Sequence, residues 1–269
     1  MKLTKWLPKP LQKIIRERMT IYVYTYAFRP SAVVKEQALK FRTPDREFTV
    51  KADYRTALYD MIGEVVDYDA YQLQKLKWDS TGEHHIMDIG ANVGVSALML
   101  SQIPNARVTC FEPDPGNCAL LRQNLELNGI TNTRVIQAAV SSVDGTTDFQ
   151  TDEESTGGYV ARESITAKDR NIKVRAMTLQ RALAECGGPA IDLLKCDCEG
   201  GEYDIIEQVT PELADRIRNL SIEVHDLDQK RNLQSISAHL SALGYQLSCK
   251  PDMWERGALH LLLARRRNV

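Results

Sequence analysis

The sequence predicts an α/β fold in which a seven-stranded, mostly parallel sheet is covered by helices on both faces. From residue 84 onward, short apolar runs alternate with segments of helical periodicity, the pattern of strands joined by crossover helices. The chain has 269 residues, of which 43% are hydrophobic and 26% charged. This length and composition allow a large buried core and exclude a disordered chain or a fibre.

The first 80 residues differ from the rest of the chain. Several prolines interrupt them, apolar residues recur at helical spacing over residues 11–19, residues 47–51 alternate like a short strand, and residues 56–71 predict a helix. We interpret residues 1–80 as a mainly helical cap that lies against a domain formed by residues 81–269. Basic and apolar residues near the N-terminus would also suit an anionic membrane surface, but a cover helix or a homodimer contact explains them better.

The elements of the main domain follow from the apolar runs and their breakers. The expected strands are residues 86–89, 107–111, 134–138, 191–196, 219–224, 246–249 and 258–263. The expected helices are residues 95–102, 115–128, 179–186, 201–208 and 229–243, with caps or breakers nearby such as Asp114 and Gly129. The polar segment 141–176 breaks this alternation and contains an alternating stretch at 146–149. It predicts an inserted hairpin and a mobile loop over the site.

Composition also limits partners and location. With 34 Lys and Arg against 36 Asp and Glu, the formal charge of −2 lacks the basic excess of a nucleic-acid binder. The sequence contains no apolar run long enough for a transmembrane helix and no secretory signal at its start, so we expect a cytoplasmic protein. The 6 cysteines are too sparse for a disulfide framework, so we expect reduced core thiols.

The most informative segment is the strand at 86–89 and the turn that follows it. The strand contains Asp88 and turns through Gly90 and Gly94 into a helix. Glycine lets the backbone approach a ligand closely, and a helix N-terminus offers free N–H groups. Such a turn suits a nucleotide cofactor, although similar turns are also purely structural in many α/β proteins.

The next strand ends at Glu112, where a carboxylate can accept hydrogen bonds from ribose hydroxyls. The alternative is a structural role beside a helix N-terminus. Of the two cofactors that suit this arrangement, NAD requires a G-x-G-x-x-G spacing that Gly90 and Gly94 do not provide. A short-chain dehydrogenase would also need a Tyr-x-x-x-Lys pair after the turn, but the only such pair in the sequence, Tyr71 and Lys75, lies before it. Because Asp88 also suits a methionine ammonium group, S-adenosylmethionine is the better candidate.

Charged residues gather at the end of the strand at 191–196. Lys195 and Asp197 share a face by strand periodicity, and buried charges require a cation, a ligand or each other. We therefore expect Asp197 and Glu199 at the acceptor side of the site, although a structural helix N-terminus would also explain Glu199. A metal site at Cys196 and Cys198 lacks further ligands at suitable spacing.

The following strand ends in Glu223 and His225. His225 can take a proton from a hydroxyl acceptor because the ordinary pKa of histidine lies near neutrality. Two alternatives remain open: a structural histidine, or an oxygen-rich divalent metal site formed with Asp197 and Glu223. We expect no metal.

Four strings, in this order and spacing, resemble the FkbM-type family of S-adenosylmethionine-dependent methyltransferases: DIGANVG at 88–94, FEPD at 111–114, LKCDCEGGE at 194–202 and IEVH at 222–225. The resemblance covers about residues 55–265. It implies the class I methyltransferase fold, which is Rossmann-like, with strand order 3-2-1-4-5-7-6 and an antiparallel final strand. Cys196 and Cys198 stand where this family usually has aliphatic residues, and Gly201 stands where alanine is frequent.

The resemblance also implies a site. The cofactor contacts would be Asp88, Gly90, Ala91, Asn92 and Gly94 for the methionine end, Glu112 with Pro113 for the ribose, Ala138 and Ala139 for the adenine, and also Asp197. From the residues themselves, we expect Asp197, Glu199 and His225 to surround the acceptor.

The function expected from the residues and the resemblance is O-methylation of a hydroxyl on a small-molecule natural product or a glycan. The alternatives are N-methylation of an amine or amide, and a non-catalytic scaffold that binds the cofactor.

Overall fold

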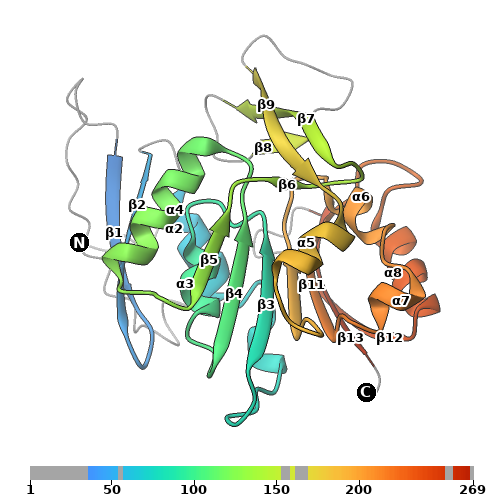
Figure 1. The fold of residues 1–269 in the computed structure, drawn as a ribbon, viewed down its shortest axis with the longest axis horizontal. Helices are drawn as coiled ribbons and strands as arrows, with labels where there is room; N and C mark the ends of the chain where they lie inside the picture. The colour runs from blue at the N-terminus through green and yellow to red at the C-terminus, as the bar shows by residue number, and fades with distance from the viewer. Residues whose placement is uncertain (1–35, 54–56, 153–157, 161–168, 252–256, 267–269) are drawn as a thin grey trace.

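The central feature of the fold is a seven-stranded sheet with the order β12-β13-β11-β10-β3-β4-β5 (Figure 1). The computed structural model describes residues 36–53, 57–152, 158–160, 169–251 and 257–266. Numbered along the chain, the seven strands follow the order 3-2-1-4-5-7-6, and β13 runs antiparallel to both of its neighbours. This confirms the expected class I methyltransferase fold.

The strands of this sheet are β3 (His84–Ile89), β4 (Ala106–Phe111), β5 (Thr133–Ile136), β10 (Leu193–Cys196), β11 (Asn219–His225), β12 (Tyr245–Pro251) and β13 (Leu259–Arg266). The helices that cover it are α3 (Val95–Leu100), α4 (Pro115–Leu127), α5 (Leu179–Glu185), α6 (Glu202–Ile206), α7 (Pro211–Ala214) and α8 (Leu233–Ala242). Each expected strand and helix of the main domain is present. The four-residue helix α7 was not expected, because so short a segment carries little periodic signal.

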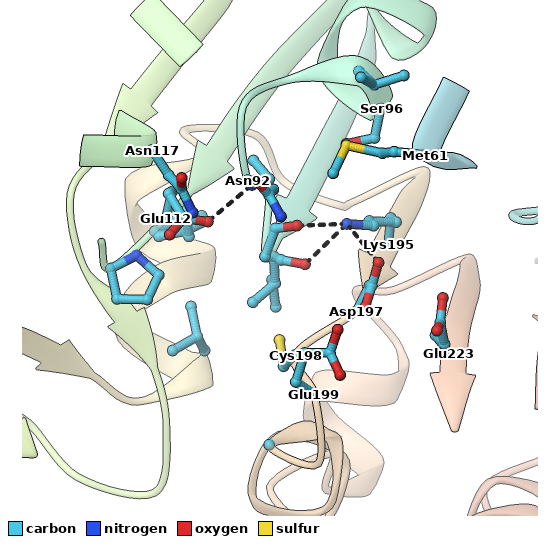
Figure 2. A pocket seen from close by; sticks show the side chains of 18 of the residues that line it. Met61, Asn92, Ser96, Glu112, Asn117, Lys195, Asp197, Cys198, Glu199 and Glu223 are labelled. Carbon is cyan, nitrogen blue, oxygen red and sulfur yellow. Dashed lines mark hydrogen bonds and ion pairs between the residues drawn. The ribbon is translucent and has the colours of Figure 1, made fainter. Parts of the chain in front are cut away.

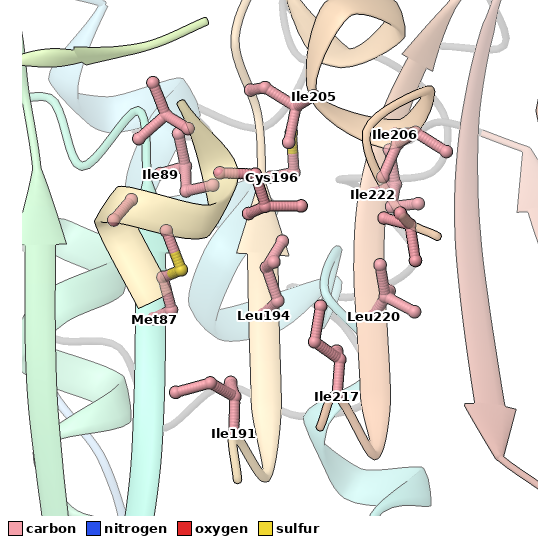
Figure 3. Close-up of a cluster of buried hydrophobic side chains, with 14 of the residues drawn as sticks. Met87, Ile89, Ile191, Leu194, Cys196, Ile205, Ile206, Ile217, Leu220 and Ile222 are labelled. Atoms are coloured by element: carbon pink, nitrogen blue, oxygen red, sulfur yellow. The ribbon is translucent and has the colours of Figure 1, made fainter. Parts of the chain in front are cut away.

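Two hydrophobic cores lie on opposite faces of the sheet, because successive residues of a strand point to opposite sides. On one face, Met87 and Leu194 pack with residues of α5, α6 and α8, as Figure 3 shows for α6. On the other face, Ile86 and Leu193 pack with residues of α3 and α4. Helices therefore cover both faces, as the alternating sequence pattern predicted.

The described part of the N-terminal cap is an antiparallel hairpin followed by short helical turns. The hairpin pairs β1 (Glu36–Arg42) with β2 (Glu47–Asp53). It is followed by α2 (Leu58–Ile62), the π-helix η2 (Gly63–Asp67) and the 3-10 helix η3 (Leu73–Lys75).

The cap differs in two ways from the mainly helical segment expected. The strand predicted at 47–51 is present within β2, but its partner β1 was missed, because its pattern includes only two large apolar residues. The helix predicted at 56–71 is shorter, because positive φ angles at Asp69 (49°) and Gln72 (54°) interrupt it. The predicted helix at 11–19 and the proposed dimer or membrane contact lie outside the described residues.

The cap packs against the main domain as part of its second core. Phe41, Phe48 and Leu58 are buried together with Leu98 of α3. In addition, the side-chain amide of Asn124 in α4 bonds to both backbone groups of Lys51, at 2.8 Å each. The described cap therefore shares a core with the sheet, and the boundary at residue 80 stays a prediction.

The end of the cap is tied to strands from the C-terminal part of the chain. The Lys250 ammonium group donates hydrogen bonds to the carbonyl oxygens of Tyr68 and Asp69, both at 2.7 Å. The Gln72 amide donates to the Leu261 carbonyl oxygen at 2.8 Å, and the Ser221 hydroxyl donates to the Tyr71 carbonyl oxygen at 2.9 Å. These bonds fix residues 68–72 against β11, β12 and β13.

The insertion forms a separate four-stranded sheet at the top of Figure 1. Its main part is the antiparallel pair β7 (Gly145–Asp152) and β9 (Asp169–Met177), with β8 (Gly158–Val160) beside β7 and β6 (Ala139–Val140) beside β9. The predicted hairpin is thereby confirmed. The strand predicted at 134–138 ends at Ile136, and the chain then enters β6. Within the described ranges, every helix is too short or too polar to span a lipid bilayer.

Candidate active site

A cavity of about 530 Å³ lies at the carboxyl ends of the central strands. Its wall combines the turn after β3 with the start of α3, the ends of β4 and β11, β10 with the loop that follows it, the strands β6 and β7, and the cap. The wall residues expected from the sequence are Gly90, Ala91, Asn92, Glu112, Pro113, Ala138, Ala139, Asp197 and Glu199. The cavity occupies the position where open α/β sheets bind ligands.

The turn after β3 is held close to β4 and to the loop after β10. The backbone N–H groups of Gly90 and Ala91 donate to the Phe111 carbonyl oxygen at 3.0 and 3.2 Å. A Cβ atom on Gly90, whose φ is +73°, would lie 1.7 Å from the Asp197 carbonyl oxygen, so only glycine fits there. Gly94 precedes α3 and packs against Leu121 outside the cavity wall, so its role is to shape the turn.

Glu112 connects the end of β4 to this turn. Its carboxylate accepts hydrogen bonds from the backbone N–H groups of Asn92 at 2.8 Å and Asp114 at 2.9 Å. Burial raises the pKa of Glu112 to about 7, although both N–H donors act in the opposite direction. Each oxygen uses one acceptor position, and the remaining lone pairs of the carboxylate are available to hydroxyl donors in the cavity.

The wall beside Glu112 is mostly apolar. Ala138 and Ala139 line the cavity together with Phe111 and with Phe149 from β7. Such a surface suits a flat aromatic ring that needs few polar partners. The sequence pattern at 146–149 indicated a strand but did not indicate that Phe149 reaches this wall.

Lys195 lies on the opposite side of the cavity from Glu112 and is 1% exposed (Figure 2). Its ammonium nitrogen lies 3.1 Å from Asp88 Oδ1 and 3.7 Å from Asp197 Oδ2, and it donates to the Gly90 carbonyl oxygen at 2.7 Å. Burial alone would lower the pKa of Lys195, but the charges of Asp88 and Asp197 raise it above its usual value. Lys195 therefore carries a positive charge.

Asp88 does not occupy the place expected from the sequence. It is fully buried and is not part of the cavity wall. Its carboxylate pairs with Lys195 and accepts a hydrogen bond from the Ser96 hydroxyl at 2.7 Å. These partners already balance its charge, and Asp88 lies behind Lys195 rather than at the cavity surface where a direct contact with a methionine ammonium group was expected.

Asp197 faces the cavity between Lys195 and the cap. The Tyr71 hydroxyl donates to Asp197 Oδ2 at 2.8 Å, and the Tyr71 ring lies 4.9 Å from the Lys195 nitrogen. Burial and the neighbouring Asp197 raise the pKa of Tyr71, so its hydroxyl stays protonated and can donate. Sequence reasoning considered Tyr71 only as half of a dehydrogenase motif and missed it here, because no local pattern predicts that the cap reaches Asp197.

The environment of His225 differs from the one that the predicted general-base role requires. It does not line the cavity. Its Nδ1 lies 3.3 Å from Glu202 Oε1, and its Nε2 lies 3.4 Å from Glu199 Oε2. Burial alone would lower the pKa of His225, but hydrogen bonds with these carboxylates raise it to about 11. A histidine that stays protonated at neutral pH cannot accept a proton from a substrate.

Glu223 is the cavity residue that sequence reasoning considered only as a metal ligand. Its side chain is 14% exposed and lies 3.8 Å from His225 Nε2. Burial and the charge of Asp197 raise the pKa of Glu223 well above its usual range. Glu199, by contrast, has a half-exposed side chain at 49%. Figure 2 shows Glu223 beside Asp197, across the cavity from Glu112.

The alternative metal sites receive no support from the geometry. Among the described residues, no group of three or more His, Cys, Asp or Glu side chains is arranged to hold a metal ion. His225 contacts Glu199 and Glu202 rather than completing a site with Asp197. The Cys196 and Cys198 sulfur atoms lie 3.8 Å apart and contact each other.

Comparison with known proteins places these observations in a family. The family model described as "Methyltransferase FkbM domain" matches residues 88–247, which is more than half of the chain. The chain is 29% identical over 211 residues to "31-O-demethyl-FK506 methyltransferase FkbM" of Streptomyces tacrolimicus, covering 67% of this chain and 80% of that protein. It is 28% identical over 213 residues to "Methyltransferase sdnD" of Sordaria araneosa, covering 68% and 82%.

A shorter match and a solved structure complete the comparison. The chain is 32% identical over 139 residues to "2-O-methyltransferase NoeI" of Sinorhizobium fredii, covering 45% of this chain and 55% of that protein. Among solved structures, an rRNA methylase from Streptococcus thermophilus matches with a TM-score of 0.45 and 12% identity, covering 76% of this chain and 96% of that one.

Proposed function

The chain belongs to the FkbM methyltransferase family, and on this premise we propose that it methylates a hydroxyl group of a small-molecule natural product or a glycan. Two relatives support an oxygen acceptor, because their names describe a 31-O-demethyl-FK506 methyltransferase and a 2-O-methyltransferase. The family implies S-adenosylmethionine as the methyl donor, which supplies, when bound, a methyl group activated by a positively charged sulfur.

The chemistry of the cavity wall fits this donor. Glu112 offers carboxylate lone pairs to ribose hydroxyls, with Pro113 beside it. Ala138 and Ala139 form part of an apolar wall that suits adenine. The backbone of residues 90–92 would hold the methionine end. Asp197 adds a negative charge that favours a cationic donor.

The main support for the proposal is that the cavity has two chemically different sides. Glu112 and the apolar wall lie on one side, and the carboxylates of Asp197 and Glu223 lie on the other (Figure 2). An enzyme that brings a hydroxyl acceptor to a methyl donor needs one side for each molecule. Holding both in line can reduce the barrier by about 7–11 kcal/mol.

We assign proton acceptance from the hydroxyl to Glu223. His225 is already protonated, and Asp197 is occupied by Tyr71 and Lys195. Glu223 lines the cavity and is mostly buried, and the neighbouring charge of His225 acts against the effects of burial and Asp197 by lowering its pKa, which favours the carboxylate form that can accept a proton. The loop residue Glu199 then contributes mainly by keeping His225 charged.

The test of the function combines donor binding with methyl transfer. Calorimetry with S-adenosylhomocysteine should show binding, and methyl-labelled S-adenosylmethionine should transfer label to members of a panel of polyhydroxylated compounds. Analysis of the product should find the label in an ether. Label found on nitrogen would establish the N-methyl alternative, binding without transfer to any panel member would favour the scaffold, and an absence of binding would refute the proposal.

The Glu223 assignment predicts a specific loss of turnover. Glu223→Gln should reduce the rate of label transfer by about 10²- to 10⁴-fold. It should change the affinity for S-adenosylhomocysteine by less than about threefold, because Glu112 and the apolar wall remain intact. The exposed Glu207→Gln serves as the matched control. An unchanged rate in Glu223→Gln would show that another group accepts the proton.

A further inference from the structure

We propose that Lys195 is a positioning residue that holds the glycine turn and Asp197 in a fixed relative arrangement, and that donor binding depends on this arrangement. The inference rests on the proposed function, because it concerns the same cavity. Among the described residues that line the cavity, Lys195 is the one buried side chain with a positive charge, and the inference gives it a role.

Strand pairing brings Lys195 to this position. In the parallel pair of β10 and β3, Lys195 lies opposite Asp88. Opposite residues in neighbouring strands point to the same face of the sheet, so the two side chains meet. The Lys195 side chain then extends past Asp88 to the turn at the end of β3, where the cavity begins.

The Lys195 ammonium group lies between the glycine turn, Asp88 and Asp197, and it also donates to the Ile89 carbonyl oxygen at 3.4 Å. Its nitrogen donates to the Gly90 carbonyl oxygen at 2.7 Å, and it lies 3.1 Å from Asp88 and 3.7 Å from Asp197. An ammonium group has three donors and no acceptor. The same group therefore contacts the donor side of the cavity, the buried acid beneath it, and the acceptor side.

The turn is held from both sides. Asn92 adopts a positive φ of 50°, a left-handed conformation that asparagine adopts more readily than most other residues except glycine. On one side, the Phe111 carbonyl oxygen and the Glu112 carboxylate accept the backbone N–H groups of residues 90–92. On the other side, Lys195 holds the Gly90 carbonyl group. Together these bonds fix the peptide groups that form the donor wall before a ligand binds.

A competing explanation is that Lys195 only balances the charge of Asp88. That explanation accounts for the 3.1 Å ion pair but not for the shorter bond to Gly90 or the approach to Asp197. The two explanations differ in what they predict when both charges are removed together. Charge balance alone predicts that the paired replacement restores the protein, whereas the positioning role predicts a folded protein with a defective donor site.

The first experiment measures S-adenosylhomocysteine binding to Asp88→Asn/Lys195→Met by calorimetry, with circular dichroism to establish folding. The replaced bonds include a charge-assisted hydrogen bond, so we expect the affinity to fall by about 10- to 100-fold. The matched control is Asp148→Asn/Lys173→Met, which removes an exposed pair at 3.0 Å and should leave affinity unchanged. Affinity within about twofold of the parent in Asp88→Asn/Lys195→Met would overturn the inference.

The second experiment is chemical rescue, which keeps the inference testable if the double variant does not fold. Lys195→Ala leaves a space that opens to the cavity, because Lys195 lines it. Ethylammonium should restore S-adenosylhomocysteine affinity at least tenfold, whereas ethanol of similar size should not. Equal effects of the two compounds, or none, would contradict a role for the charge. Failure of the parent protein itself to bind S-adenosylhomocysteine would instead refute the proposed function.

Discussion

At the scale of single residues, the cavity shows two opposite effects of burial on charged side chains. Glu112 accepts only backbone N–H groups, so burial dominates and its pKa rises to about 7. His225 is buried among carboxylates, which overcome the effect of burial and keep the imidazole protonated. Glu112 can therefore bind a neutral hydroxyl group. His225, which stays protonated, cannot accept a proton.

The role of Glu112 predicts a loss of donor affinity on substitution. Glu112→Ala should weaken S-adenosylhomocysteine binding by about 10- to 100-fold, because hydrogen bonds to a charged acceptor are lost. Glu126→Ala, an exposed change on α4, is the control. In the parent, affinity should fall as the pH decreases through about 7, since protonation of Glu112 removes acceptor capacity. Equal affinity of Glu112→Ala and the parent would refute the ribose assignment.

The environment of His225 predicts an unusual titration. Nitrogen chemical shifts from NMR should show His225 doubly protonated at pH 8, where an ordinary histidine with a pKa near 6.5 is neutral. Its stabilising contribution should be fully present below pH 6.5 and should be lost as the pH rises through about 11. A titration midpoint near 6.5 would return His225 to the set of candidate bases.

At the scale of elements, the strand-turn-helix unit of β3 and α3 depends on close approach of the β10 loop. Gly90→Ala should abolish S-adenosylhomocysteine binding and destabilise the protein by several kcal/mol, because its Cβ would overlap the Asp197 carbonyl group. Gly129→Ala is the control, since its φ of +62° is similar but no atom lies within 4 Å of the added Cβ. It should cost only about 1–2 kcal/mol and leave binding unchanged. Urea unfolding and calorimetry measure both effects.

The same elements show how far sequence reasoning extends. The strands, the glycine turn and the position of Glu112 at a strand end were predictable, because buried strands and turns carry local periodic and conformational signals, whereas the strand order was predicted only by the resemblance to a known family. The strand β1 and the cavity residues Tyr71 and Phe149 were not, because their roles depend on contacts with distant segments. The position of Asp88 beneath the wall and the charge of His225 likewise depend on partners that only the folded chain brings together.

At the scale of the whole molecule, the described cap and the sheet share one hydrophobic core, so they should unfold together. Phe48→Ala, at a fully buried position of the cap, should destabilise the protein by about 3–5 kcal/mol. Leu127→Ala, at a position 49% exposed, should change stability by less than about 0.5 kcal/mol. Circular dichroism and tryptophan fluorescence should report one coincident urea transition in each protein. Two separated transitions would show that the cap folds independently.

The bonds that join residues 68–72 to β11, β12 and β13 also bear on biosynthesis. A ribosome makes Tyr71 long before it makes Lys250 and Leu261, so a nascent chain lacks the partners that anchor the cap beside the cavity. The pocket can therefore be completed only after the last strands emerge. Translation that stops before β12 would yield a polypeptide that contains the whole glycine turn, Lys195 and Ser221, yet lacks the Lys250 and Leu261 contacts that hold residues 68, 69 and 72.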